Sequence, residues 1–321
     1  MNGGSGRSGR IRVGISGWRY APWRGRFYPE GLAQRAELAY AAQRFGAIEI
    51  NGSFYSLQHP ASYASWYAQT PPDFMFAVKG GRFITHLKRL REIERPLANF
   101  FASGVFNLRE KLGPILWQLP PNFRFERERL ARFFAALPRD TGAALALARR
   151  RDPRLMKGRC RLGIDARRAL RHAIEVRHES FADPRFIELL READIALVVS
   201  ESARSWPLIE DVTSDFLYLR LHGERELYRG GYGPRALDRW AQRIGAWARG
   251  EEPADARKAA PGLTAAAQAR DVYCFFDNTD DKLRAPVDAA ALMRRLGLAP
   301  PGSAPPARRA RLEAGSAALI Q

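Results

Sequence analysis

Residues 173–177 read AIEVR, a short stretch in which apolar and charged side chains alternate. Successive side chains of a β-strand point to opposite faces, so Ile174 and Val176 share one face while Glu175 and Arg177 share the other. In a barrel of parallel strands, the outer face packs against apolar helices. The stretch therefore predicts a barrel strand whose aliphatic side chains face outward and whose charged side chains face the interior.

Two other stretches repeat this layout. In AIEIN (47–51) the isoleucines oppose Glu49 and Asn51, and in FLYLRLH (216–222) the leucines oppose a tyrosine, an arginine and a histidine. Apolar and β-branched runs predict strands at 11–16, 47–51, 74–79, 114–119, 173–177, 195–199, 216–222 and 272–277. Three of these strands are thus expected to direct acids, bases and amides into one interior.

The segments between the strands mostly show helical spacing. Four apolar stripes carry this signal: Leu38, Ala42 and Phe45; Phe101, Val105, Leu108 and Leu112; Leu237, Trp240, Ile244 and Trp247; and Ala289, Leu292, Met293 and Leu296. The segment after the fourth strand is long enough for two helices, and the segment after the sixth marks no clear helix. Residues 250–270 are of low complexity and predict a surface loop with a helical part.

Strands joined mainly by helices predict an α/β fold, a single (β/α)8 barrel of the TIM type, which usually needs about 250 residues. We expect this domain to span 11–298. Disordered basic tails are expected at 1–10 and 299–321, where Gly, Ser, Pro, Ala and Arg dominate. A doubly wound sheet is the competing fold, but the first strand leads into GISGWRY rather than a G-x-G-x-x-G turn.

Composition narrows the class of protein. The two cysteines, Cys160 and Cys274, are too few for a disulfide framework or a thiolate metal site. The chain has neither a secretory leader nor a long apolar run, so we expect a soluble cytoplasmic protein without membrane contact. The net charge of +18 comes mainly from scattered arginines. It is consistent with a general basic surface or with a nucleic-acid partner.

The active sites of such barrels lie where the strands end, at the C-terminal face. Polar side chains gather at most of these positions. The candidate ligand-binding residues are Trp18, Asn51, Tyr55, Lys79, His86, Gln118, Arg177, Arg220, Arg229, Asp277 and Asn278, and the candidate catalytic residues are Glu49, Glu175 and His222. A compensated ion-pair layer that only fixes the barrel is the structural alternative.

The residue types suggest roles within this site. Glu49 and Glu175 are candidates for an acid/base carboxylate pair, and His222 for a proton carrier. Lys79, Arg177 and Arg220 are expected to clamp an anion, with the amides Asn51, Gln118 and Asn278 orienting it.

The oxygen and imidazole groups also suit a divalent metal, but the neighbouring cations would repel it, so we predict no metal ligands. No motif in the sequence indicates a particular cofactor.

Two groups of loops support a site at the same face. The stretch 222–233 (HGERELYRGGYG) combines arginines with a glycine pair, and barrels often bind phosphate after strands seven and eight. An ordinary flexible loop is the alternative reading. The first two loops are rich in aromatic residues, which stack on a sugar or base or form a packed cap over the barrel mouth.

Seven ordered motifs resemble the YecE-like family, described as domain of unknown function 72. They are GISGWRYAPWRGRFYPEG, EINGSFYSL, FMFAVKGGRFITHLKRL, LWQLPPNF, AIEVRHESF, YLRLHG and FDNTDDKLRAPVDA. The resemblance covers roughly residues 12–298 and implies a TIM-type barrel, but no reaction, cofactor or catalytic residues. Gly52 and Thr279 depart from the family pattern, which favours a serine or threonine and an acid there.

The leading hypothesis is a barrel enzyme of the hydrolase, lyase or isomerase type. It would act by acid/base chemistry on a small anionic substrate that is phosphorylated or sugar-like. One alternative is a nucleic-acid-associated protein or nuclease that uses the arginine-rich surface. Another is a non-catalytic ligand-binding module. The sequence indicates no particular oligomeric state.

Overall fold

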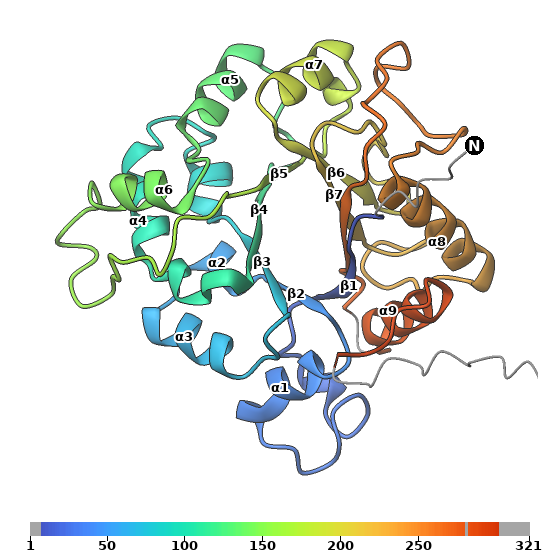
Figure 1. Ribbon diagram of the computed structural model, residues 1–321, viewed down its shortest axis with the longest axis horizontal. Helices are drawn as coiled ribbons and strands as arrows, with labels where there is room; N and C mark the ends of the chain where they lie inside the picture. Colours follow the sequence, from blue (N-terminus) through green and yellow to red (C-terminus); the bar gives the residue numbers. More distant parts are fainter. Residues whose placement is uncertain (1–7, 280–281, 302–321) are drawn as a thin grey trace, which may run out of the picture.

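The computed structural model describes residues 8–279 and 282–301, and its eight strands form one closed parallel barrel in sequential order. Figure 1 shows helices arranged around this barrel. The strands are β1 (Ile11–Ser16), β2 (Ala47–Ile50), β3 (Met75–Lys79), β4 (Leu112–Gln118), β5 (His172–Glu175), β6 (Ala196–Glu201), β7 (Phe216–Leu221) and β8 (Asp271–Phe276). The prediction of a TIM-type barrel is confirmed.

Helices connect most of the strands. They are α1 (Glu37–Ala42), α2 (Gly52–Tyr55), α3 (Pro60–Ala68), α4 (Glu94–Ala102), α5 (Arg127–Ala136), α6 (Thr141–Ala148), α7 (Pro184–Glu192), α8 (Pro234–Arg249) and α9 (Arg284–Arg295). Short helical turns are η1 (Ala21–Trp23), η2 (Gln34–Ala36), η3 (Phe83–Leu87), η4 (Val105–Lys111) and η5 (Glu179–Phe181). Two helices follow β4, as the length of that segment predicts. Within the described ranges, no helix is both long and apolar enough to cross a membrane.

Two apolar clusters lie on opposite sides of the barrel wall. The larger cluster joins outward residues of the strands, such as Ile174 and Leu219, to helix residues such as Trp240 of α8. The smaller cluster fills the barrel interior with Ala47, Ala77, Leu116, Ala173, Ala196, Val198, Phe216, Tyr218, Tyr273 and Phe275. The aliphatic faces of AIEIN, AIEVR and FLYLRLH thus point outward, as the alternation predicts.

The apolar stripe from Phe101 to Leu112 does not form one helix. Helix α4 ends at Ala102, and Gly104 follows with φ of +101°, a left-handed conformation that breaks the helical path. The chain then forms the tight turns of η4, and Leu112 is already the first residue of β4. The predicted continuous helix is therefore wrong, because the spacing persists through a glycine that changes the direction of the chain.

The connection between β6 and β7 contains no helix, which agrees with its weak sequence signal. The extended segment 202–215 takes the place of a helix and packs against 250–270, drawn in orange in Figure 1. Glu210 accepts a hydrogen bond from the backbone of Arg257, and Asp211 from the backbone of Ala259. Residues 250–270 are non-helical throughout, so the helical part expected there is wrong.

Most of the expected tails, at 1–7 and 302–321, lie outside the described residues. The last residues of the expected N-terminal tail do make contacts. The backbone of Gly9 donates to Ala248, and the backbone of Arg10 donates to the carboxylate of Asp271. The described chain is thus joined to α8 and β8 just before β1 begins.

Candidate functional site

A layer of polar side chains closes the barrel interior at the C-terminal end of the strands. All of its members except Ser16 lie two residues after an apolar interior residue, because alternate residues of a strand share a face. The layer consists of Ser16, Glu49, Lys79, Gln118, Glu175, Ser200, Arg220 and Asp277, all of them buried. The layer therefore brings together six of the candidate residues: Glu49, Lys79, Gln118, Glu175, Arg220 and Asp277.

Arg220 joins three carboxylates of this layer. Its Nε and Nη2 donate to the two oxygens of Glu49 at 3.0 and 2.9 Å. Nη1 donates to Glu175 at 2.7 Å, and Nη2 also donates to Asp277 at 2.9 Å. Burial by itself would lower the pKa of Arg220, but the three carboxylates raise it well above its usual value. The guanidinium is thus a fixed, permanently charged centre.

Glu49 and Glu175 are saturated with hydrogen bonds. Glu49 also accepts from Ser16 at 2.8 Å and from Tyr218 at 2.6 Å. Glu175 also accepts from Gln118 at 2.8 Å and from Nε and Nη2 of Arg177 at 3.1 and 3.0 Å.

Burial would raise the pKa of Glu175, but the charges of Arg177 and Arg220 outweigh burial and hold it well below the usual value. The two expected acid/base carboxylates therefore face one shared cation.

His222 lies in a chain of polar groups beside this centre. Its Nδ1 is 3.0 Å from Asp277 Oδ2, and its Nε2 is 3.1 Å from the hydroxyl of Ser200. No motif in the sequence predicted that a serine, a histidine and an aspartate would lie together here. The indole of Trp206 donates to the same hydroxyl at 2.9 Å, and the rings of Trp206 and Tyr228 pack edge-on against the imidazole. The hydroxyl is thus covered, which disfavours Ser200 as a nucleophile.

Asp277 is the exposed end of this chain. Its side chain keeps 12% of its surface accessible, whereas those of Glu49 and Glu175 are fully buried. Burial would raise the pKa of Asp277, but the charge of Arg220 and the hydrogen bond from His222 hold it below the usual range. Of the three carboxylates, Asp277 is the one that a bound molecule would meet.

Lys79 differs from Arg220, the other cation of the layer. Its ammonium lies 4.3 Å from the ring centroid of Phe54, and no described carboxylate comes within 4.0 Å of it. Burial lowers the pKa of Lys79 to about 8, with a further contribution from Arg220. Burial also lowers the pKa of His86 to about 4, and the charge of Lys79 adds to this effect. At neutral pH the barrel mouth therefore holds the neutral imidazole of His86 and the amine of Lys79, whose basicity is reduced.

The remaining predicted residues lie around the layer rather than in it. Trp18 and Asn51 line a separate cavity of about 230 Å³, and Asn51 Oδ1 has no described hydrogen-bond partner there. Asn278 donates to the backbone of Gly230 and to Asp288, so its amide holds the loop after β7. The side chains of Tyr55 and Arg229 are exposed, and their described contacts do not reach the polar layer.

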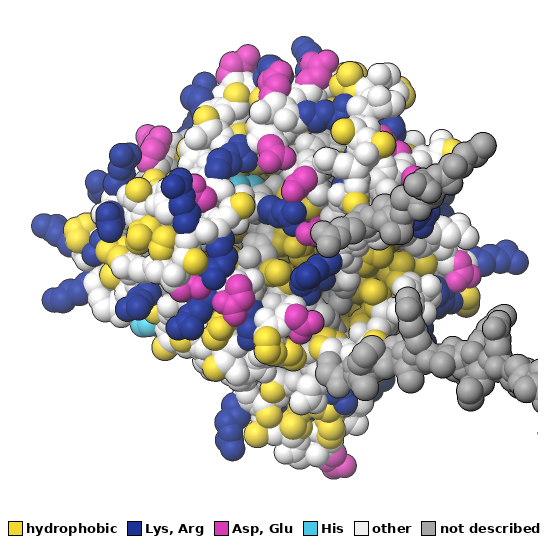
Figure 2. Space-filling view, viewed as in Figure 1, with side chains coloured by type: hydrophobic (Ala, Val, Ile, Leu, Met, Phe, Trp, Pro, Cys, Tyr) yellow, Lys and Arg dark blue, Asp and Glu magenta, His cyan; other side chains and the backbone are white. Residues whose placement is uncertain are grey.

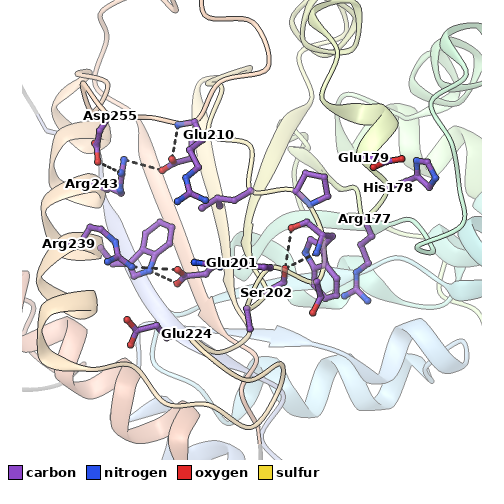
Figure 3. A pocket seen from close by; sticks show the side chains of 18 residues that line it. Arg177, His178, Glu179, Glu201, Ser202, Glu210, Glu224, Arg239, Arg243 and Asp255 are labelled. Atoms are coloured by element: carbon purple, nitrogen blue, oxygen red, sulfur yellow. Dashed lines mark hydrogen bonds and ion pairs between the residues drawn. The ribbon is translucent and has the colours of Figure 1, made fainter.

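A larger cavity of about 870 Å³ adjoins the mouth, between the segment after β6 and helix α8. It lies where the absent helix between β6 and β7 would otherwise pack. Figure 3 shows Arg177 on one side of this cleft, Arg243 with Asp255 on the other, and Glu201 between them. Arg177 belongs to both regions, because it binds Glu175 and also lies 4.1 Å over the ring of Trp206.

Sequence reasoning missed most of the cleft. Glu201 is the last residue of β6, but its partners come from α8. The indole of Trp240 donates to it at 2.7 Å, and Arg239 lies 3.6 Å away. Burial raises the pKa of Glu201 and that of Glu210, which pairs with Arg243. The sequence pattern that could have indicated the cleft is the placement of Arg239 and Arg243 around Trp240 on α8.

The described residues contain no group of three or more His, Cys, Asp or Glu side chains arranged to hold a metal ion. In the polar layer, the position among the carboxylates is occupied by the guanidinium of Arg220.

A family model described as "Protein of unknown function DUF72" matches residues 12–311. Among curated proteins, the UPF0759 protein YunF of Bacillus subtilis (strain 168) is 29% identical over 126 residues, 38% of this chain and 44% of the relative. The UPF0759 protein YecE of Escherichia coli (strain K12) is 28% identical over 113 residues, 35% of this chain and 39% of the relative. The chain thus matches less than half the length of these curated relatives.

Solved structures resemble the whole barrel. The crystal structure of a DUF72 family protein from Thermotoga maritima MSB8 matches with a TM-score of 0.65 and 23% identity, covering 90% of this chain and 99% of that one. A DUF72 family protein from Enterococcus faecalis V583 matches with a TM-score of 0.62 and 17% identity, covering 91% and 100%. At these identities the likeness shows the fold alone. The motif-based resemblance to the family is confirmed.

Proposed function

The chain belongs to the DUF72 family, and within that family we propose that it is an enzyme acting by acid/base chemistry on a small anionic substrate at the barrel mouth. The reacting groups would come from the polar layer, and the substrate would enter through the adjoining cleft.

One observation carries the proposal: the two cations of the layer and the adjoining Arg177 differ in how many carboxylates bind them. Arg220 is fully buried and is bound by three carboxylates. Arg177 binds Glu175 through Nε and Nη2, which leaves Nη1 without a described partner at the edge of the cleft. Lys79 has no described carboxylate partner at all. A purely structural layer would be expected to pair each buried charge.

The proposed roles follow from accessibility. Arg177 offers the N–H groups of Nη1 to a carboxylate or phosphate, and Lys79 offers a second positive charge. Asp277 faces the mouth, with His222 directly behind it, so this pair would pass protons to and from the substrate. Gln118, 5% exposed beside Glu175, would orient the bound molecule.

Glu49 and Glu175 take a different role from the acid/base pair that their sequence positions suggested. Each uses both carboxylate oxygens in hydrogen bonds, and two arginines keep Glu175 ionised. In the proposed mechanism they hold Arg220 and Arg177 in place and supply fixed negative charge. Proton transfer passes instead to Asp277 and His222.

Thermal-shift measurements with a panel of small carboxylates, phosphate monoesters and sugar acids would test the proposal. A compound present at 100 times its Kd should stabilise the protein by about 2.7 kcal/mol. Arg177→Gln should weaken binding at least about tenfold, because the anion loses its planar donor. The matched control is Arg249→Gln on the solvent-exposed face of α8, which should bind normally.

The variant Asp277→Asn separates binding from catalysis. It should still bind the compound found in the screen but lose its conversion, followed by mass spectrometry. The proposal fails if no member of the panel stabilises the protein, or if Arg177→Gln binds as tightly as the unaltered chain. Binding without any conversion by the unaltered chain would instead support the non-catalytic ligand-binding module.

A second candidate function is association with nucleic acid, with or without cleavage. Its support is the net charge of +18 over the whole chain. Phosphate backbones attract such a surface without regard to base sequence. The salt dependence considered in the Discussion separates this candidate from the enzyme.

A further inference from the structure

Two lysines of the described chain, Lys79 and Lys111, are buried, and their surroundings differ sharply. The ammonium of Lys111 donates to the backbone oxygens of Tyr67 and Thr70, both at 2.7 Å, and to the Thr70 hydroxyl at 3.1 Å. All three of its hydrogens are therefore used. The ammonium of Lys79 faces the ring of Phe54, and none of its described contacts is a hydrogen bond.

The reason is competition for the carboxylates. Lys79 ends β3 and points into the same interior as Glu49, Glu175 and Asp277, but Arg220 binds all three of them. An amine left without an acceptor in a desolvated place is more easily deprotonated. With a pKa of about 8, about a tenth of Lys79 is neutral at pH 7, against about one part in 2,500 for an exposed lysine at its ordinary pKa of about 10.4.

We propose that Lys79 is a nucleophilic amine that forms an imine with a small carboxylic acid that also carries an aldehyde or keto group. The imine forms at the carbon of that aldehyde or keto group. This inference rests on the proposed function, because it takes the barrel mouth as the active site and narrows its substrate class. The neighbouring cations would hold the acid group of the same molecule. The electron-poor imine carbon then stabilises negative charge on the adjacent carbon, which is what lyases and isomerases of this kind exploit.

The step balances without a redox partner. The lone pair of the neutral Nζ attacks the carbonyl carbon, a C–N bond forms, and the carbonyl oxygen takes up a proton to give a carbinolamine. The C–O bond then breaks, and the two hydrogens of the amine leave with the oxygen as one water.

Reductive trapping of the full chain with glyoxylate and cyanoborohydride would test the inference. Hydride addition to the imine leaves a carboxymethyl group on the lysine that reacted. We expect Lys79 to be the first lysine labelled at pH 7, located by peptide mass spectrometry, at least about ten times faster than any exposed lysine. The rate should rise with pH up to about 8 and then level off.

Two variants serve as matched controls. Lys79→Arg keeps the charge but cannot form an imine, so the early label should vanish. Lys111→Arg alters the other buried lysine and should leave the label unchanged. Because peptide mapping locates the label in the unaltered chain, the result does not depend on the folding of either variant.

Labelling of Lys79 no faster than that of exposed lysines, or equal labelling of Lys79 and Lys111, would overturn the inference. This failure is distinct from failure of the proposed function. If anions bind through Arg177 but Lys79 stays unlabelled, only the imine is excluded. If Lys79 is labelled but no member of the anion panel binds, the amine is reactive and the anionic substrate class is wrong.

Discussion

At the scale of single residues, the guanidinium of Arg220 links carboxylates from three different strands. Glu49 comes from β2, Glu175 from β5 and Asp277 from the end of β8. Such a buried cluster adds little net stability when complete, because desolvation offsets the attraction. Removing its centre is a different matter, since three carboxylates would then lie close together without compensation.

Arg220→Met should therefore lower the free energy of unfolding by at least about 3–5 kcal/mol. Urea denaturation followed by tryptophan fluorescence measures this change. The matched control is Arg249→Met, since Arg249 and Glu251 form an ion pair with both side chains more than half exposed. That control should stay within about 0.5 kcal/mol of the unaltered chain. An Arg220→Met protein of unchanged stability would show that the layer does not depend on this cation.

His172 is a buried histidine outside the candidate site. Its Nδ1 accepts a hydrogen bond from the indole of Trp117 at 3.2 Å, and its Nε2 lies 2.8 Å from the carbonyl of Pro138. Nε2 therefore carries the proton of the neutral ring, and no nitrogen remains to accept another. Burial lowers the pKa of His172 from 6.5 to about 4.

This shift predicts a pH dependence of stability. Between pH 6.5 and 4 the unfolded chain binds a proton at His172 that the folded chain excludes. The free energy of unfolding should therefore fall as the pH drops through this window, by up to about 1.4 kcal/mol per pH unit.

His172→Gln should be less stable at pH 7 but should lose this part of the slope, measured as urea midpoints across the window. The exposed His59 provides the control, because His59→Gln should keep the slope. An unchanged slope in His172→Gln would contradict the assignment.

At the scale of elements, the decisive feature is the connection between β6 and β7. Where a helix usually covers the barrel, two non-helical segments, 202–215 and 250–270, cover it together. The carboxylate of Asp211 joins them by accepting hydrogen bonds from the backbone of Ala259 at 2.6 Å and Ala260 at 3.2 Å. Residues of both segments, such as Trp206 and Asp255, line the cleft together with α8.

Asp211→Ala should loosen the 250–270 segment without unfolding the barrel, because two backbone N–H groups lose their acceptor. Hydrogen exchange read by mass spectrometry should become at least about tenfold faster in that segment, while β1 to β8 stay protected. Asp255→Ala is the control within the same segment, since the Asp255 side chain is 78% exposed and its described side-chain contact is with Arg243. Equal exchange in both variants would show that Asp211 does not hold the segment.

At the scale of the whole molecule, the excess of basic residues is spread over the surface. Figure 2 shows dark-blue Lys and Arg side chains interspersed with magenta Asp and Glu side chains on the visible face. Many arginines are also engaged in ion pairs, for instance Arg127 with Glu192 and Arg171 with Asp215. Such a distribution suits general attraction to polyanions better than recognition of one nucleic-acid shape.

We therefore expect duplex DNA to bind weakly and with the same affinity for unrelated base sequences. The logarithm of the binding constant should fall linearly with the logarithm of the salt concentration, with a slope of about −0.9 for each phosphate contacted. Fluorescence anisotropy over a salt series measures this slope. Binding that favours one sequence or structure would instead support the nucleic-acid function, and binding that does not weaken with salt would exclude the phosphate attraction on which that function rests.

Most of the architecture could be read from the sequence. All eight strands lie within a few residues of their predicted positions, and the inward direction of Glu49, Glu175 and Arg220 followed from alternation. Helix α8 followed equally well from its apolar stripe. Two predictions of helices failed. The apolar spacing from Phe101 to Leu112 predicted one helix, but the left-handed conformation of Gly104 interrupts it, and residues 250–270 contain no helix.

The barrel and the identity of the groups at its mouth thus follow from the order of the amino acids, because strand alternation and helix periodicity are properties of neighbouring residues. The pairing of those groups follows from the folded barrel. Closure of the barrel places all three carboxylates around Arg220 and places His222 between Asp277 and Ser200. It leaves Lys79 without a carboxylate partner among the described residues. Pairing depends on contacts between strands far apart in the chain, which no local pattern records.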